Sequence, residues 1–83
     1  MSTDQNRPIY EIADDIRKDW GKKIYFGAKP YLEAMLSLTS VTENYIADSA
    51  DSIIRYFLAN ANTYRGENAR KYKQELKKIV GIK

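Results

Sequence analysis

The side chains best suited to binding chemistry in this sequence are the basic ones near its C-terminus. The last fifth of the chain holds seven lysines and arginines against two glutamates, a local net charge of +5. Six of them form a candidate surface for a polyanion or another partner: Arg65, Arg70, Lys71, Lys73, Lys77 and Lys78. On a helix, Arg70, Lys73 and Lys77 share one row, with Lys71 and Lys78 on the far side. Such a row can follow a phosphate backbone, or it can be an ordinary solvated face.

The same region could instead form a helix-turn-helix. A turn at 62–66 would join two predicted helices, and the second helix would enter a major groove. Glu67, Asn68 and Lys71 would then approach the edges of the bases.

A second candidate surface is acidic. Glu11, Asp15 and Asp19 recur every four residues, so they line up along one side of a predicted helix. Like charges at this spacing repel slightly, which suggests a basic partner. That partner could be another protein, or the basic helix of this chain within one molecule or across a dimer. A solvated acidic face is the alternative.

Aromatic residues are numerous, with seven tyrosines and one tryptophan. Trp20 falls on a predicted apolar stripe and is expected in the core. Tyr10 and Tyr25 fall outside the stripes, and if exposed together they would be interface candidates. The Arg65-Gly66 step, beside Tyr64, could present a guanidinium to a partner. We favour a structural turn in which the glycine takes a positive φ and Arg65 stacks on Tyr64.

The sequence lacks the residue types that most catalytic and metal-binding sites use. The chain has no cysteine and no histidine, so it lacks the thiolate nucleophile, the commonest general base and the commonest zinc ligand. Asp14 and Asp15 diverge on a helix, and Asp48 and Asp51 suit a helix cap. We therefore expect no enzyme, cofactor, metal or small-molecule ligand. Without cysteines or a long apolar run, we expect a cytoplasmic protein that spans no membrane.

The spacing of apolar residues predicts four helices and no sheet. Residues 1–7 are expected to be a flexible tail, and 8–83 a single helical domain. The first helix runs over 8–21, and residues 24–27 form a buried linker. A short helix opens at Pro30 and ends near 37–40, and residues 42–45 form a loop or one helical turn.

The third helix follows a cap at Asp48 or Ser49, carries an apolar face from Ala50 to Tyr64, and is ended by Asn60, Asn62 and the Arg65-Gly66 step. The fourth helix runs over 67–80. Short links imply antiparallel neighbours. The predicted fold is therefore an all-α, compact bundle of three longer helices and one short one.

Several segments of the sequence also resemble those of a known group of proteins. Tyr56-Phe57-Leu58-Ala59-Asn60-Ala61, Tyr64-Arg65-Gly66-Glu67 and the upstream Lys29-Pro30-Tyr31-Leu32-Glu33-Ala34-Met35 carry the likeness. It is to short uncharacterised helical proteins of Gram-positive bacteria and their phages or mobile elements. The resemblance implies an accessory role, such as modulation of a host nuclease or polymerase, and transfers no site residue.

These patterns predict a non-catalytic helical interaction module that binds another protein or itself. The alternative is a nucleic-acid-binding accessory or regulatory protein that uses the basic C-terminal helix.

Overall fold

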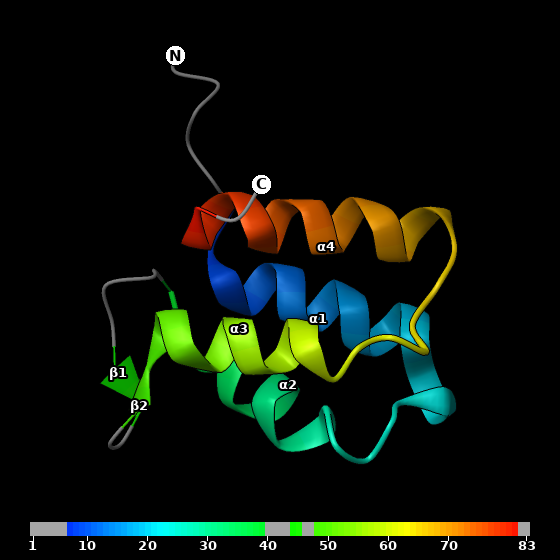
Figure 1. Ribbon diagram of the computed structural model, residues 1–83, viewed down its shortest axis with the longest axis horizontal. Helices are drawn as coiled ribbons and strands as arrows, with labels where there is room; N and C mark the ends of the chain where they lie inside the picture. The colour runs from blue at the N-terminus through cyan, green and yellow to red at the C-terminus, as the bar shows by residue number, and fades with distance from the viewer. Residues whose placement is uncertain (1–6, 40–43, 46–47, 82–83) are drawn as a thin grey trace.

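The computed structural model describes residues 7–39, 44–45 and 48–81 (Figure 1). Along them lie the helices α1 (Ile9–Trp20), α2 (Lys29–Met35), α3 (Ala50–Ala59) and α4 (Glu67–Val80). A 3₁₀ turn, η1 (Gly21–Lys23), extends α1. Two-residue strands, β1 (Asn44–Tyr45) and β2 (Asp48–Ser49), pair antiparallel before α3, with Asn44 opposite Ser49 and Tyr45 opposite Asp48.

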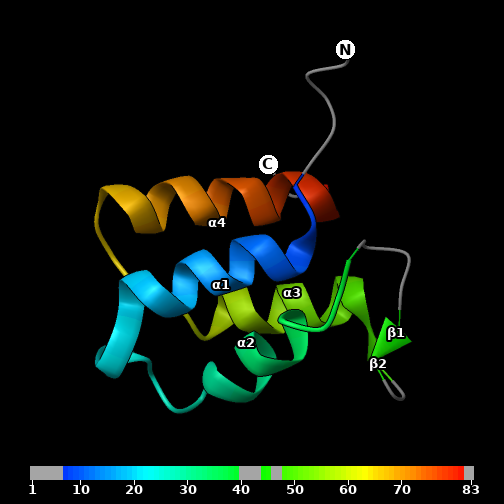
Figure 2. The same ribbon diagram turned by 180° about the vertical axis from the view of Figure 1, so that it is seen from behind.

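The helices pack in a closed ring, in which α1 contacts α4 and α2, while α3 contacts α2 and α4. Figures 1 and 2 show α4 running back along α1 and α3 in the opposite chain direction. The short α2 lies on the side of the bundle away from α4 (Figure 1). The predicted all-α bundle of four helices is thereby confirmed. Within the described ranges, no helix has the length and apolar character needed to cross a membrane.

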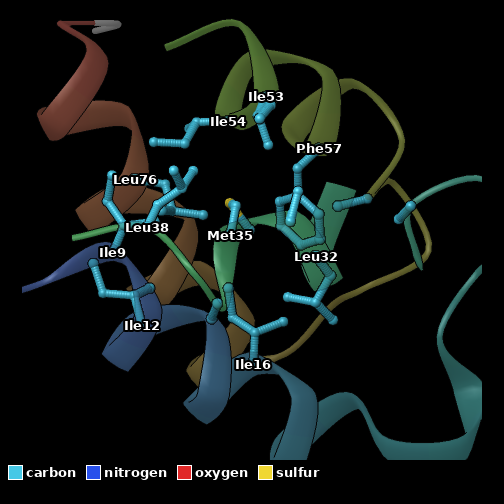
Figure 3. Packing of buried hydrophobic residues seen from close by; sticks show 14 of the residues in the cluster. Ile9, Ile12, Ile16, Leu32, Met35, Leu38, Ile53, Ile54, Phe57 and Leu76 are labelled. Atoms are coloured by element: carbon cyan, nitrogen blue, oxygen red, sulfur yellow. The ribbon is translucent and has the colours of Figure 1, made fainter. Parts of the chain in front are cut away.

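All four helices contribute to one core. Figure 3 shows Ile12 and Ile16 of α1, Met35 of α2, Phe57 of α3 and Leu76 of α4 converging on a common centre. Each of these side chains is completely buried. Burying a side chain of this size contributes roughly 1.5–3 kcal/mol relative to leaving it exposed. The apolar stripe predicted for the first helix is buried along its whole length.

The first turns of α1 and α3 obtain their hydrogen-bond acceptors in different ways. The backbone N–H groups of Ile9 and Tyr10 donate to the carbonyls of Thr39 and Leu38, at 3.0 and 2.8 Å. The segment after α2 therefore caps α1, which has no side-chain cap. Ser49 caps α3 as predicted, because its Oγ accepts from the backbone N–H of Ser52 at 3.1 Å.

The predicted buried linker is wrong for its two aromatic residues. Ile24 is partly buried, but Tyr25 is 42% exposed and Phe26 is 79% exposed. The run 24–27 is apolar enough to suggest burial, yet it leads into a turn over 26–28, and its two rings pack against each other at the surface instead of entering the core.

Two other local predictions also need correction. Asn44 and Tyr45 form β1 and not a loop or helical turn, whereas residues 42–43 lie outside the described part. Residues 1–6 of the expected tail lie outside it as well. Arg7, expected in the same tail, is instead held by three carboxylates.

Candidate functional site

A hollow of ≈ 340 Å³ lies beside α4, and we call it the α4 groove. Its lining residues are Tyr64, Arg65, Gly66, Ala69, Arg70, Lys73, Gln74 and Lys77. Four of the eight are cationic and none is acidic. Among the described residues, none of these four cations forms an ion pair, so their charges are not neutralised by a neighbouring carboxylate.

Helical spacing brings three of the cations together. Arg70, Lys73 and Lys77 are three and four residues apart, which places them on one side of α4. Arg65 precedes the helix and lines the same groove. Gly66 connects it to α4, and the φ of 120° and ψ of −179° at Gly66 suit only glycine. Nothing lies within 4 Å of a Cβ built on Gly66, so the backbone conformation, and not space, demands the glycine.

The connection from α3 to α4 is anchored on α1 by Tyr64. The ring of Tyr64 stacks on that of Trp20, with centroids 4.8 Å apart. Its hydroxyl donates to Asp19 Oδ2 at 2.7 Å. Burial and this bond raise the pKa of Tyr64 well above its ordinary value. The bonds from Tyr64 and Asn68 lower the pKa of Asp19, so the carboxylate is charged at neutral pH.

Lys73 is partly buried beside Tyr64 in the groove. Its Nζ donates to the carbonyl oxygen of Tyr64 at 2.6 Å and lies 5.7 Å from the centre of the same ring. Partial burial, followed by the charges of Lys77 and Arg65, lowers the pKa of Lys73. The groove therefore concentrates positive charge that a bound anion would relieve.

The structure divides the predicted basic surface into two parts. Arg65, Arg70, Lys73 and Lys77 line the α4 groove, whereas Lys71 and Lys78 are exposed outside it. Gln74, which the sequence pattern did not single out, lines the same groove, and its place one helical turn after Arg70 could have identified it.

Arg65 does not stack on Tyr64 as predicted. Its Nε instead donates to the carbonyl oxygen of Asn62 at 3.2 Å, within the connection. The Tyr64 ring is already covered by Trp20, and Lys73 is the cation that lies near it.

The geometry differs from that of a helix-turn-helix. The connection over 60–66 is longer than the turn of about three or four residues in that motif. α3 and α4 run antiparallel in both views (Figures 1 and 2). Asn68, proposed to approach bases, donates its amide N–H to Asp19 at 3.1 Å. The α4 groove is therefore the better-formed site.

The predicted acidic row is satisfied inside the molecule. Arg7 donates to both carboxylate oxygens of Glu75 on α4, at 2.8 and 3.0 Å. It also donates to Asp15 at 2.7 Å and to Glu11 at 3.2 Å. Asp19 is bonded to the start of α4 as described above. The row is therefore bonded within one molecule, but its basic partner is Arg7 and not a lysine or arginine of the fourth helix.

The exposed aromatic residues fall into three groups along the chain. Tyr10, 45% exposed, lies at the start of α1, whereas Tyr25 follows its far end, so the predicted pair does not share a surface. Tyr25 instead lies 4.9 Å from Phe26, centre to centre. Tyr56, 51% exposed, lies 5.5 Å from the ring of Tyr31 on α2.

Metal ligands are not grouped in the described residues, which contain no cluster of three carboxylates that could hold an ion. Comparison with known proteins gives no significant match to a family model, to a curated protein or to a solved structure. The site must therefore be interpreted from its own geometry.

Proposed function

We propose that this protein is a non-catalytic binding module that holds the phosphate backbone of a nucleic acid in the α4 groove. The observation that carries the proposal is the convergence of Arg65, Arg70, Lys73 and Lys77 on one hollow without a carboxylate. Each phosphate that such cations contact releases condensed counterions, so the binding energy comes from charge and shape and needs no reactive group. The proposal includes a cytoplasmic location, where nucleic acid is accessible.

The sequence alone favours a protein partner over nucleic acid, because a lysine-rich helix face is commonplace. Two features of the site favour nucleic acid instead. The acidic row that could recruit a basic protein is engaged by Arg7, Tyr64 and Asn68. The basic row borders a hollow, so several cations can contact one ligand at once.

The test is a titration of labelled oligonucleotides against the full chain, followed by fluorescence anisotropy at several salt concentrations. With about three or four phosphate contacts, the logarithm of the association constant should fall with the logarithm of salt concentration with a slope of about −2 to −4. Absence of binding at low salt would refute the proposal.

Charge reversal then locates the surface. Lys73 also holds the carbonyl of Tyr64, so the informative pair is Arg70→Glu with Lys77→Glu. We expect this pair to lower affinity at least tenfold, since two contacts become repulsions. The matched control is Lys71→Glu with Lys78→Glu, which makes the same charge change on the same helix outside the groove. Equal losses in both pairs would mean that net charge, and not the groove, drives binding.

A second candidate function is self-association or protein binding through exposed aromatic rings. The observation that favours it is Phe26, which is 79% exposed beside Tyr25. Large aromatic side chains are enriched at the centre of protein interfaces. Sedimentation equilibrium over a hundredfold range of concentration tests the self-association form, which predicts a dimer that Phe26→Ser dissociates.

A further inference from the structure

Two more hollows lie around the connection from α3 to α4. The middle hollow, of ≈ 310 Å³, is lined by Asp19, Trp20, Lys23, Thr63, Tyr64 and Arg65. The Tyr25 hollow, of ≈ 360 Å³, is lined by Tyr25, Ala59, Asn60, Asn62 and Thr63. The middle hollow shares Tyr64 and Arg65 with the α4 groove and Thr63 with the Tyr25 hollow. Shared lining residues thus link the three hollows in series along the connection, and we call this series the path.

The chemistry of this path changes along its length. Its α4 end is cationic, and Lys23 and Arg65 continue the positive charge into the middle hollow. Asp19 is the carboxylate in the path, and both of its oxygens already accept bonds, from Tyr64 and Asn68. The other end carries an aromatic ring, two amides and a hydroxyl, with no formal charge.

The ring at the uncharged end lies close against Gly27. A Cβ on Gly27 would lie 2.5 Å from Cε2 of Tyr25 and 3.2 Å from Oδ1 of Asn60. Glycine is therefore what lets the Tyr25 ring fold back over the turn, close to the end of α3. The neighbouring Phe26 ring, tilted 53° to it, extends the aromatic surface into solvent.

Amides beside this ring supply hydrogen-bonding groups. The Nδ2 of Asn60 donates to the carbonyl oxygen of Tyr56 at 2.9 Å, which orients the side chain with Oδ1 toward Gly27. Asn62 and Thr63 are exposed in the connection. Amide and hydroxyl groups next to an exposed aromatic ring match the edge and the face of an unpaired nucleobase.

We propose that the ligand of the α4 groove is single-stranded nucleic acid, with its phosphates along α4 and a base stacked on Tyr25 and Phe26. This inference rests on the function proposed above and specifies its substrate class. A duplex keeps its bases stacked inside, so it cannot offer one to the Tyr25 ring, whereas a single strand can follow a charged path and turn a base onto a ring.

The experiment compares four probes of matched charge on the full chain: single-stranded DNA, single-stranded RNA, duplex DNA and inorganic polyphosphate. We expect either single strand to bind at least tenfold more tightly than the duplex or the polyphosphate, which lacks bases. The two single-strand arms identify which nucleic acid is preferred. Equal affinity for all four probes overturns the inference and leaves the groove's role intact.

Ring variants then test the stacking. Tyr25→Ala and Phe26→Ala should each weaken single-strand binding about tenfold while leaving polyphosphate binding unchanged. Gly27→Ala, which displaces the Tyr25 ring without removing it, should also weaken single-strand binding and leave polyphosphate binding unchanged. The control is Tyr10→Ala, an exposed tyrosine at the start of α1, away from the path.

The outcomes separate the two proposals. If the Tyr25 and Phe26 variants bind single strands as the unmodified chain does, the stacking inference is wrong while the Arg70 and Lys77 result still stands. If no probe binds at low salt, both proposals fail. If Phe26→Ala instead abolishes a dimer, the rings belong to a protein interface and the inference is overturned.

Discussion

At the scale of single residues, Tyr64 connects the fold to the candidate site. Its ring packs on Trp20, its hydroxyl reaches Asp19, and its carbonyl oxygen accepts from Lys73. The residue therefore determines where Arg65 lies relative to the α4 row. A tyrosine can serve both purposes because it has a large apolar body and a polar tip.

The Tyr64–Asp19 bond predicts a pH dependence. The folded pKa of Asp19 is lowered, so the stability it contributes is present above its unfolded pKa of about 3.9 and is lost as pH falls through the folded value. Tyr64→Phe removes the largest cause of the lowering, and the pKa of Asp19 should rise toward its ordinary value. Carboxylate NMR titration measures it directly.

Urea unfolding checks the consequence for stability. The loss of stability on acidification should be smaller in Tyr64→Phe than in the unmodified chain. Tyr31→Phe is the control, since Tyr31 lies on α2, is partly buried and is not one of the described side chains that donate to Asp19. An unchanged Asp19 titration in Tyr64→Phe would show that the hydroxyl does not interact with this carboxylate in solution.

At the scale of elements, the helix ends differ in what closes them. α1 is capped by carbonyls from the segment after α2, so its first turn depends on tertiary structure. α4 ends at Gly81, whose φ of 78° is left-handed, and Arg55 of α3 donates to the Val80 carbonyl at 2.8 Å. α3 alone among these begins with its own side-chain cap, Ser49.

The Ser49 cap can be measured in isolation. Ser49→Ala should lower the free energy of unfolding by about 1 kcal/mol, because the N–H of Ser52 loses its acceptor. Ser52→Ala is the matched control, since it keeps the backbone N–H and therefore the cap, and removes only the bond that Ser49 Oγ donates to Ser52 Oγ at 3.0 Å. Urea denaturation of both variants checks this, and a loss in Ser52→Ala as large as in Ser49→Ala would contradict the assignment.

At the scale of the whole molecule, Arg7 joins segments that are far apart in the sequence. It bonds to Glu75 of α4, 68 residues away, and to Asp15 and Glu11 of α1. Its guanidinium lies 5.9 Å from the ring centre of Tyr72. The ion pairs raise the pKa of Arg7, so it is charged at every accessible pH. Arg7, which lies just before α1, is thus held against the helix that carries the groove.

Arg7→Ala should therefore destabilise the fold by about 1 kcal/mol at low salt, the upper part of the range for partly exposed pairs. The loss should shrink as salt screens the charges. Arg17→Ala is the control, because Arg17 pairs only locally with Asp14 within α1, and its effect should be smaller. Equal effects of the two variants in urea unfolding would argue against a bridging role.

Much of the fold is encoded locally. Side chains on a helix repeat every 3.6 residues, so the spacing of Ile9, Ile12 and Ile16 was enough to predict which face of α1 is buried. The same periodicity predicted the bounds of α4 and the row of Arg70, Lys73 and Lys77. The sequence also predicts the helix cap at Ser49 and the positive φ of Gly66, because each depends on residues within one turn.

Packing between distant segments decided the rest. Which cations share a hollow depends on how the connection to α4 is seated on α1, and no local pattern records the contact of Tyr64 with Trp20. The pairing of Arg7 with Glu75 and the exposure of Phe26 were missed for the same reason. A helical period specifies which face is apolar, but only the folded chain specifies which faces meet and which side chains are left in solvent.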